Sequence, residues 1–393
     1  MDVFEKCSKI TDQTRMMREK GYYFFFRKIE SGQDSEVTVD GRRIIMAGSN
    51  NYLGLTNHPR VKEAGIRAIE KYGCGCAGSR FLNGNLEIHE ELEEKLARFF
   101  RKEAALVFAT GYQTNLGAIS ALVGRNDIAI IDKYDHASII DGCRLSFGTV
   151  KKFRHNDMDD LEKTLQDARG KGKLIIVDGI FSMEGDITNL PPLVEIAKAH
   201  GARVMVDDAH GIGVLGKGGR GTAEHFDLEN EVDLIMGTYS KSLAAIGGFV
   251  AGRKEIIEFI KHTGRSMMFS ASLPPPLVAS VSAALDIIEE QPELRARLWR
   301  NTRKMLQGYK ALGFDTGNSE TPIIPIILKD SIKVYEMCRL LFENGVFVNP
   351  VVSPAVPPGR ELLRTSCMAT HTEEQLDQVL WAFEKVGKQL GVI

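Results

Sequence analysis

Short apolar runs alternate with amphipathic helical stretches along most of the chain after residue 60, and this alternation constrains the fold more than any other feature. One helical stretch ends at Gly73, and a second covers residues 89–100. Five apolar runs with the length of buried strands follow: AALVFA, IAIID, KLIIVDGIF, ARVMVDD and VDLIMGTY. Because helices separate several of these runs, we expect an α/β fold with a mostly parallel sheet covered by helices on both faces.

The composition excludes several classes of protein. Hydrophobic residues make up 43% and charged residues 26% of the chain, which is typical of a folded globular protein. Fifty basic residues against 52 acidic ones leave no positive excess to attract nucleic acid. No apolar run approaches the roughly 20 residues of a spanning helix, and the first 20 residues lack the apolar segment of a signal peptide.

The cysteines point to a reducing compartment. The chain has six, and only Cys74 and Cys76 lie close together in the sequence. One such pair supports neither a disulfide framework nor a metal site. We therefore expect a cytoplasmic protein without a metal, and we leave open a loose association with a membrane.

The length of 393 residues favours more than one domain, and we expect three parts. Residues 1–58 form an N-terminal arm and hairpin, residues 59–276 a large domain, and residues 277–393 a smaller C-terminal α/β domain. In the first part we expect a helix near residues 1–20 and a hairpin over residues 36–46. The last part is expected to open with one long helix over about 277–312, followed by short strands, a helix and a final helix from Thr372.

An aromatic run, Gly21 to Arg27, follows the first helix. Aromatic rings bury well wherever they meet protein, so our preferred interpretation is an arm that packs on the body of the chain or on a partner subunit. A surface for acyl chains or for a membrane is the alternative.

Three strand ends carry polar side chains, where ligands bind in folds of this kind. Asp207 and Asp208 follow one apolar run and precede His210, while Lys241 lies among hydroxyls after another. His136 follows a third run. Each feature alone has an ordinary explanation: a capping aspartate, a surface lysine or a histidine at a helix start.

Together these residues suit a pyridine cofactor. A lysine can form a Schiff base with it, an aspartate can keep its ring nitrogen protonated, and a flat histidine such as His136 can stack on its ring. The segment from Phe108 to Gln113 runs from a strand end through Gly111 into a helix, and the start of a helix binds phosphate. Thr238 adds a hydroxyl to that phosphate site.

At these residues the chain resembles the pyridoxal-phosphate enzymes of fold type I and, within them, the α-oxoamine synthases. The resemblance covers nearly the whole chain through the motifs GSNNYLGL, FATGYQTN, DKYDHASIIDG, FSMEGD, VDDAHGIGVLG, GRGTAEHFD and GTYSKSLA. It implies a large domain with a mostly parallel seven-stranded sheet and a smaller α/β C-terminal domain. It also implies pyridoxal 5'-phosphate as the cofactor and a homodimer with shared active sites.

The resemblance assigns roles by motif. Lys241 would form the Schiff base, Asp207 would pair with the pyridine nitrogen, and His136 would stack on the ring. The residues that would hold the phenolic oxygen or the phosphate are His210, Ser182, Gly111, Tyr112, Thr238, Ser240 and, from the other subunit, Ser270. Arg364 would bind the carboxylate of the amino acid, with Asn51 near the same substrate.

The motifs are most similar to those of bacterial serine palmitoyltransferases. That activity condenses L-serine with a long-chain acyl-CoA such as palmitoyl-CoA, releases CoA and CO2, and yields 3-oxosphinganine, the first step of sphingolipid synthesis. Glycine C-acetyltransferase and a cysteate acyltransferase of sulfonolipid synthesis remain alternatives, as does a non-catalytic regulatory subunit of a heterodimer. One departure is that the loop Asn349 to Pro354 lacks the second arginine of some serine palmitoyltransferases.

Overall fold

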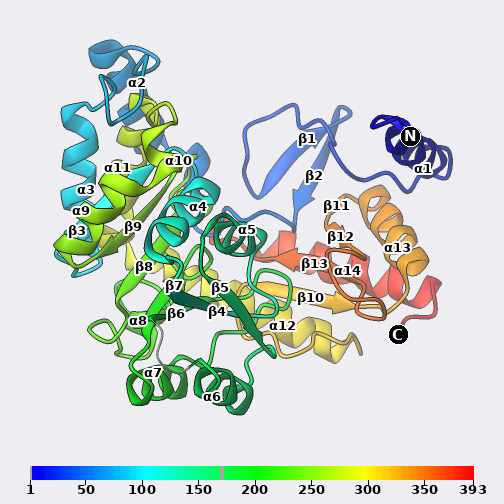
Figure 1. Ribbon diagram of the computed structural model, residues 1–393. Helices are drawn as coiled ribbons and strands as arrows, with labels where there is room; N and C mark the ends of the chain where they lie inside the picture. The colour runs from blue at the N-terminus through cyan, green and yellow to red at the C-terminus, as the bar shows by residue number, and fades with distance from the viewer. Residues whose placement is uncertain (1, 169–171) are drawn as a thin grey trace. The chain divides into compact units, whose positions relative to one another are not determined.

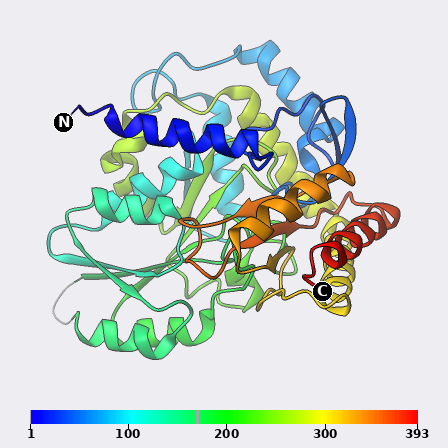
Figure 2. The same ribbon diagram turned by 90° about the vertical axis from the view of Figure 1, so that its right-hand side faces the viewer.

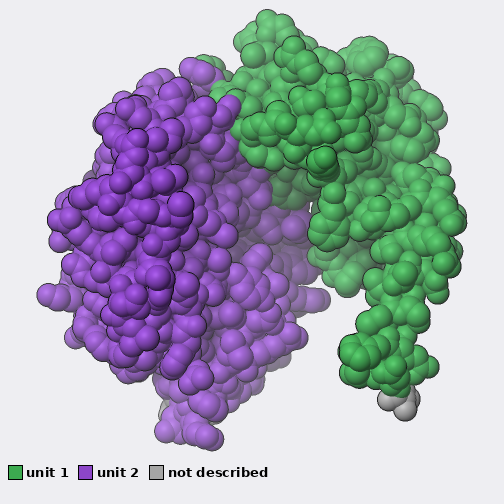
Figure 3. Space-filling view, turned by 90° about the horizontal axis from the view of Figure 1, so that it is seen from above, with its two compact units in different colours: residues 1–49, 299–393 green, residues 50–298 purple. Residues whose placement is uncertain are grey.

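The computed structural model describes residues 2–168 and 172–393, and its internal contacts divide the chain into two compact units. One unit is residues 50–298, and the other combines residues 1–49 with residues 299–393 (Figure 3). The N-terminal arm and the C-terminal segment therefore belong to one compact unit. The expected division into functional domains at residues 58 and 276 stays a prediction.

A seven-stranded sheet forms the centre of the unit 50–298 (Figure 1). Its strand order is β3-β9-β8-β7-β6-β4-β5, and only β9 runs antiparallel to its neighbours. This confirms the mostly parallel sheet. The strands are β3 (Ala104–Phe108), β4 (Asp127–Asp132), β5 (Thr149–Phe153), β6 (Gly172–Asp178), β7 (Arg203–Asp207), β8 (Leu234–Thr238) and β9 (Gly248–Gly252).

Side chains alternate between the two faces of this sheet, and the helices cover both. Ile176, Met205 and Met236 point to one face, where they pack in a buried cluster with side chains of α4 (Gly111–Leu122), α5 (Ala137–Leu145) and α9 (Lys254–Thr263). Helices α6 (Met158–Gln166) and α7 (Leu190–Ala199) cover the opposite face (Figure 1). The remaining elements of this unit are η1 (Leu55–Asn57), α2 (Pro59–Tyr72), α3 (Glu87–Phe99), α8 (Thr222–His225), α10 (Arg265–Met268) and α11 (Pro275–Glu290).

This alternation sorts the polar residues at the strand ends. Asp178 and Asp207 are register partners on β6 and β7, and they share the face of Ile176 and Met205. On β4 it is Ile131 that belongs to the cluster under α4 and α5. Successive side chains of a strand point to opposite faces, so Asp132 points to the other face. The site under α4 and α5 therefore receives Asp178 and Asp207 but not Asp132.

The second unit contains two three-stranded sheets with helices. One sheet has the order β1-β2-β11 and the other β10-β13-β12. Helices α13 and α14 lie side by side (orange and red in Figures 1 and 2). The elements are α1 (Glu5–Glu19), β1 (Glu36–Val39), β2 (Arg42–Met46), β10 (Ile323–Ile327), α13 (Ser331–Glu343), β11 (Val346–Phe347), β12 (Asn349–Val351), β13 (Leu362–Ser366) and α14 (Glu373–Gln389).

The expected hairpin is confirmed. Strands β1 and β2 pair antiparallel through a two-residue turn, in which Asp40 has a φ of 50° and Gly41 a φ of 69°. Both residues adopt the left-handed conformation that such tight turns require, which aspartate and glycine tolerate best.

The single long helix expected over about 277–312 is wrong. The chain forms α11 (Pro275–Glu290) and then α12 (Pro292–Ala311), with a break at Gln291. Pro292 cannot donate a backbone hydrogen bond, and it pushes the residue before it out of the helical conformation. Gln291 accordingly has a φ of −123° and a ψ of 65°.

The aromatic arm packs in part on its own unit, in agreement with the preferred interpretation. Tyr22 stacks on Tyr335 of α13 at a centroid distance of 5.8 Å, and Phe24 is buried. Phe26, in contrast, is 94% exposed. No helix among the described residues is long and apolar enough to cross a membrane.

Candidate active site

A cavity of about 330 Å³ opens at the carboxyl ends of the central strands of the unit 50–298. Nine residues expected in the site line it: Gly111, Tyr112, His136, Ser182, Asp207, His210, Thr238, Ser240 and Lys241. Six further lining residues were not expected: Thr110, Ser138, Asp178, Ala209, Met236 and Ile246. Residues from the ends of β6, β7 and β8 and from the starts of α4 and α5 thus converge on one space.

The start of α4 forms a cradle for an anion. Thr110 caps the helix, and its hydroxyl accepts a hydrogen bond from the backbone N–H of Gln113 at 3.1 Å. A Cβ atom at Gly111 would lie 2.5 Å from Thr238 Oγ1, so only glycine allows this close approach. The Thr238 and Ser240 hydroxyls lie 3.0 Å apart beside it. Backbone N–H groups at a helix start together with hydroxyls suit a phosphate.

Asp207 is buried at the end of β7, with 3% of its surface exposed. One carboxylate oxygen accepts a hydrogen bond from Asn115 Nδ2 at 2.7 Å, and the other accepts from the backbone N–H of Ala209 at 3.1 Å. Two donors hold the carboxylate in one orientation at the wall of the cavity. An acid in this place can keep a pyridine nitrogen protonated.

Asp208 faces away from the cavity. Its carboxylate accepts hydrogen bonds from the backbone N–H of Thr222 at 2.6 Å and from the Thr222 hydroxyl at 2.8 Å, which ties β7 to the start of α8. Burial raises the pKa of Asp208 to about 7, although the bonds from Thr222 act in the opposite direction. The adjacent aspartates therefore differ in role: Asp207 lines the cavity, and Asp208 connects β7 with α8.

His136 lies at the rim of the cavity as the N-cap of α5. Its ring meets the edge of Tyr112 at a centroid distance of 6.4 Å, and its Nδ1 lies 2.7 Å from the Ser138 hydroxyl. Surrounding protein lowers the pKa of His136 by desolvation, although the charge of Asp207 opposes this shift. Desolvation therefore favours the neutral form of the ring.

His210 faces the cavity from the loop after β7, and a buried tyrosine fixes it. The Tyr52 hydroxyl lies 2.6 Å from His210 Nδ1, and Tyr52 is 1% exposed. Ser182 lines the same cavity from the loop after β6. Both residues line the cavity as expected. Tyr52 was not expected, because the motif SNNYLGL does not show that its partner is His210.

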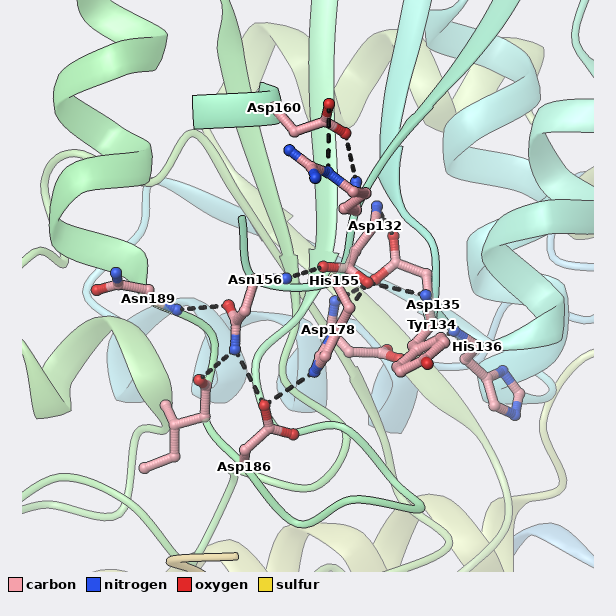
Figure 4. A network of polar contacts seen from close by, with 12 residues as sticks. Asp132, Tyr134, Asp135, His136, His155, Asn156, Asp160, Asp178, Asp186 and Asn189 are labelled. Atoms are coloured by element: carbon pink, nitrogen blue, oxygen red, sulfur yellow. Dashed lines mark hydrogen bonds and ion pairs between the residues drawn. The ribbon is translucent and has the colours of Figure 1, made fainter. Parts of the chain in front are cut away.

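A nest of carboxylates lies behind His136 (Figure 4). The Asp178 carboxylate accepts from the backbone N–H of His136 at 2.9 Å, and the Asp135 carboxylate accepts from the N–H groups of Asp178 and Asp132. Burial raises the pKa of Asp135 and of Asp178, and the neighbouring carboxylates, Asp207 among them for Asp178, raise it further. These backbone bonds fix the loop that carries His136.

His155 neutralises the far side of this nest (Figure 4). Its Nδ1 lies 3.0 Å from Asp132 and its Nε2 lies 2.9 Å from Asp186, while its ring stacks on Tyr134. Burial alone would lower the pKa of His155, but the two hydrogen-bonded carboxylates raise it to about 9. A charged imidazolium therefore clamps the loop after β6 to the end of β4.

Three expected site residues do not line this cavity. Ser270 accepts a hydrogen bond from Gln113 Nε2 at 3.2 Å within its own chain, and the Asn51 amide donates to Thr56 Oγ1 at 2.6 Å. Arg364 is buried in β13 of the other unit, opposite Asn349 of β12. Their expected roles stay predictions.

The residues around the cavity fit a pyridoxal phosphate. The start of α4 with Thr238 and Ser240 would hold the phosphate, Asp207 the ring nitrogen, and Lys241 the carbonyl carbon. The glycine at position 111 is the observation that carries the fit, because any side chain there would fill the phosphate cradle.

Residues 42–383 match the family model described as "Aminotransferase class I and II", and the chain belongs to this family. A serine palmitoyltransferase of Sphingobacterium spiritivorum is 54% identical over 377 residues, which cover 96% of this chain and 94% of that protein. An 8-amino-7-oxononanoate synthase of Thermoanaerobacter pseudethanolicus is 47% identical over 386 residues, with 98% of each chain covered.

A solved structure described as "Sphingomonas wittichii Serine palmitoyltransferase" has a TM-score of 0.97 and 38% identity over 100% of both chains. The chain is thus an α-oxoamine synthase of fold type I, and among these relatives it is more similar to the bacterial serine palmitoyltransferases than to the 8-amino-7-oxononanoate synthase.

Asp207→Asn should lower turnover far more than Asp208→Asn. An amide at position 207 cannot hold the proton of a pyridinium, so we expect a loss in kcat of at least about 100-fold. Asp208→Asn should instead lower stability by about 1–3 kcal/mol through its bonds to Thr222. Turnover of both variants and urea unfolding curves measure the two effects, and equal losses of turnover would contradict the assignment.

His155→Gln should lower stability in a pH-dependent way. The pKa of His155 is about 9 in the folded chain, against 6.5 for an ordinary histidine in the unfolded chain. The contribution of its charge to the free energy of unfolding is therefore fully present below pH 6.5 and is lost as the pH rises through 9. At about 1.4 kcal/mol per pKa unit, we expect a destabilisation on the order of 3–4 kcal/mol at pH 6.

Urea unfolding at pH 6 and pH 10 measures this effect, with the exposed His225→Gln as the matched control. The difference in free energy of unfolding between His155→Gln and the unchanged protein should shrink from pH 6 to pH 10. A difference that stays constant would contradict a charged His155.

Proposed function

We propose that the chain catalyses the pyridoxal-phosphate-dependent, decarboxylating condensation of L-serine with palmitoyl-CoA, which yields 3-oxosphinganine, CoA and CO2. The observation that carries the proposal is the convergence of Lys241, Asp207 and His136 on one cavity beside the phosphate cradle of α4. The 54% identity to a serine palmitoyltransferase supports the choice of serine and of a long acyl chain. This reaction is the first step of sphingolipid synthesis.

Pyridoxal phosphate, when bound, supplies an electron sink for negative charge at the α-carbon of the amino acid. Lys241 Nζ would attach the cofactor, and the start of α4 would bind its phosphate. Asp207 would keep the ring nitrogen protonated, and the two donors at its carboxylate hold it in place for this task.

The side chains around the cavity move protons and orient the substrates. After the amino group of serine has displaced it from the cofactor, the free amine of Lys241 would take the proton from the α-carbon and return a proton there after CO2 has left. His136 donates a hydrogen bond to the thioester oxygen as negative charge develops on it. The acyl group passes to the α-carbon, and CoA leaves as the thiolate.

Arg364 binds the carboxylate of serine, with Asn51 near the same substrate. A guanidinium can hold a carboxylate through two parallel hydrogen bonds, which fixes its orientation. Arg364 is 5% exposed, as expected for a binding residue rather than a surface charge. An unchanged KM for serine in Arg364→Lys, which loses the paired geometry, would contradict this role.

We also infer that the active form is a homodimer in which Ser270 reaches the phosphate of the second subunit. Large apolar side chains near this segment are exposed in the single chain: Phe269 at 74%, Leu82 at 79% and Phe81 at 51%. A second copy would remove this surface from water, and burial of such rings and aliphatic chains is favourable. Light scattering of the purified protein at micromolar concentration measures the state directly.

Loose contact with a membrane is a further part of the proposal. Helix α1 buries none of its residues, and Phe4, Ile10 and Phe26 are exposed at 72%, 60% and 94%. Exposed apolar side chains beside Lys6 and Lys9 suit the interface of an anionic bilayer, where the acyl-CoA and the product also partition. If the protein does not float with anionic vesicles in a density gradient, the membrane contact is contradicted, while the proposed reaction is unaffected.

Lys241→Ala should abolish turnover and leave a folded dimer. The variant has neither the amine that attaches the cofactor nor the base for the α-proton. The visible absorption band of the holoenzyme should lose its response to borohydride, while the elution volume on gel filtration stays unchanged. Turnover at the level of the unchanged protein would overturn the proposed chemistry.

The experiment that tests the proposed function is a panel of serine, glycine and cysteate against acyl-CoA of two to eighteen carbons, with CoA release as the readout. Serine with long chains should outperform glycine with acetyl-CoA. We expect catalytic efficiency to rise from about eight to sixteen carbons, because each buried CH2 contributes roughly 0.8 kcal/mol of binding energy.

The panel also separates the alternatives. A preference for glycine with acetyl-CoA would identify a glycine C-acetyltransferase, and a preference for cysteate would change the lipid product while leaving the mechanism in place. No CoA release with any pair would support a regulatory subunit.

A further inference from the structure

A directional chain of hydrogen bonds connects Asp207 with the ring of His136. Asn115 Nδ2 donates to the Asp207 carboxylate at 2.7 Å and to the Ser138 hydroxyl at 2.8 Å. Ser138 Oγ in turn lies 2.7 Å from His136 Nδ1. Asn115 is 0% and Ser138 2% exposed, so water does not compete for these bonds.

The carboxylate sets the direction of the first bond. Asp207 in its ionised form only accepts hydrogen bonds, so the group of Asn115 that faces it must be the amide NH2. The opposite assignment would place the amide oxygen 2.7 Å from a carboxylate oxygen. Asn115 Oδ1 has no hydrogen-bond partner among the described residues, so the amide orientation follows from its two donor bonds alone.

Two donors set the direction of the bond between Ser138 and His136. The same NH2 group of Asn115 donates its other hydrogen to Ser138 Oγ, which occupies one lone pair of that oxygen. The backbone N–H of Ser138 can only donate, and it donates to His136 Nδ1 at 3.3 Å, so Nδ1 is an acceptor and the Ser138 hydroxyl uses its hydrogen toward it. A neutral imidazole that accepts at Nδ1 carries its proton at Nε2.

We propose that Asn115 and Ser138 are positioning residues that fix His136 as the Nε2–H tautomer, with Asp207 as the origin of the chain. Neither residue was among those expected in the site. The backbone N–H of His136 donates to Asp178 and holds the loop (Figure 4), whereas the bonds through Asn115 and Ser138 hold the ring itself. The consequence rests on the proposed function, because the donor to the thioester oxygen is then the Nε2–H group.

The charge of Asp207 thus acts at two places. It faces the site of the pyridine ring directly, and through Asn115 and Ser138 it selects which nitrogen of His136 donates into the cavity. Asp207 and His136 are therefore coupled through hydrogen bonds. Loss of the Ser138 hydroxyl breaks this connection and leaves both residues in place.

The test measures the tautomer of His136 directly. Protein labelled with ¹⁵N-histidine is studied by NMR at pH 8, with and without pyridoxal phosphate, and the His136→Gln variant identifies the signal. We expect the Nε2–H tautomer in the unchanged chain and a shift toward Nδ1–H in Ser138→Ala. Ser138→Thr keeps the hydroxyl and should restore the original tautomer.

Kinetics provide a second readout. Ser138→Ala should lower kcat on the order of 10- to 100-fold with little change in the KM for serine, and Ser138→Thr should recover most of this loss. Ser120→Ala is the matched control, because the Ser120 hydroxyl donates to the backbone carbonyl of Leu116 within its own helix α4. This control should leave both the tautomer and kcat unchanged.

The outcomes separate this inference from the proposed function. An Nδ1–H tautomer in the unchanged chain, or an unchanged tautomer in a folded Ser138→Ala variant, would overturn the inference even if the enzyme condenses serine. The expected tautomers in a protein that releases no CoA would instead support the inference and contradict the proposed function.

Discussion

The in-register pairing of β6 with β7 is the constraint on which the site depends. Because Asp178 and Asp207 are register partners on adjacent parallel strands, both carboxylates point to the face covered by α4 and α5. The same alternation brings Thr238 of β8 against Gly111 at the start of α4. A slip of one residue in β7 would move Asp207 to the opposite face, away from the amide of Asn115, and would separate Asp208 from Thr222.

Two buried carboxylates side by side create an electrostatic problem that the surrounding residues solve asymmetrically. Asp207 receives two hydrogen bonds, one of them from the Asn115 amide. Asp178 is buried, and burial together with the charge of Asp207 raises its pKa. Asp178 accepts from the backbone N–H of His136, so the two acids serve different partners. His155 compensates the acids on the far side.

Much of this arrangement could be predicted from the sequence, for reasons that are local. Apolar runs that end in a charged residue mark strands at a ligand-binding edge, and Asp207, His136 and Lys241 were found in this way. Asp178 ends the run KLIIV in the same manner, and the same rule would have identified it. Strand β5 was missed because its residues TVKKF are mostly exposed, and β9 because glycines flank it. Asn115, Ser138 and Tyr52 were missed because their roles depend on partners 23 to 158 positions away.

The proposed site depends on one acid, Asp207, which strand register places at the cavity and which hydrogen bonds connect with His136. A crystal structure of the protein with bound pyridoxal phosphate tests this most directly. We predict an Asp207 carboxylate oxygen within about 3.0 Å of the pyridine nitrogen, continuous density between the cofactor and Lys241 Nζ, and the phosphate at the N–H groups that begin α4. A cofactor bound with its ring nitrogen away from Asp207, or with its phosphate outside the Gly111 cradle, would contradict it.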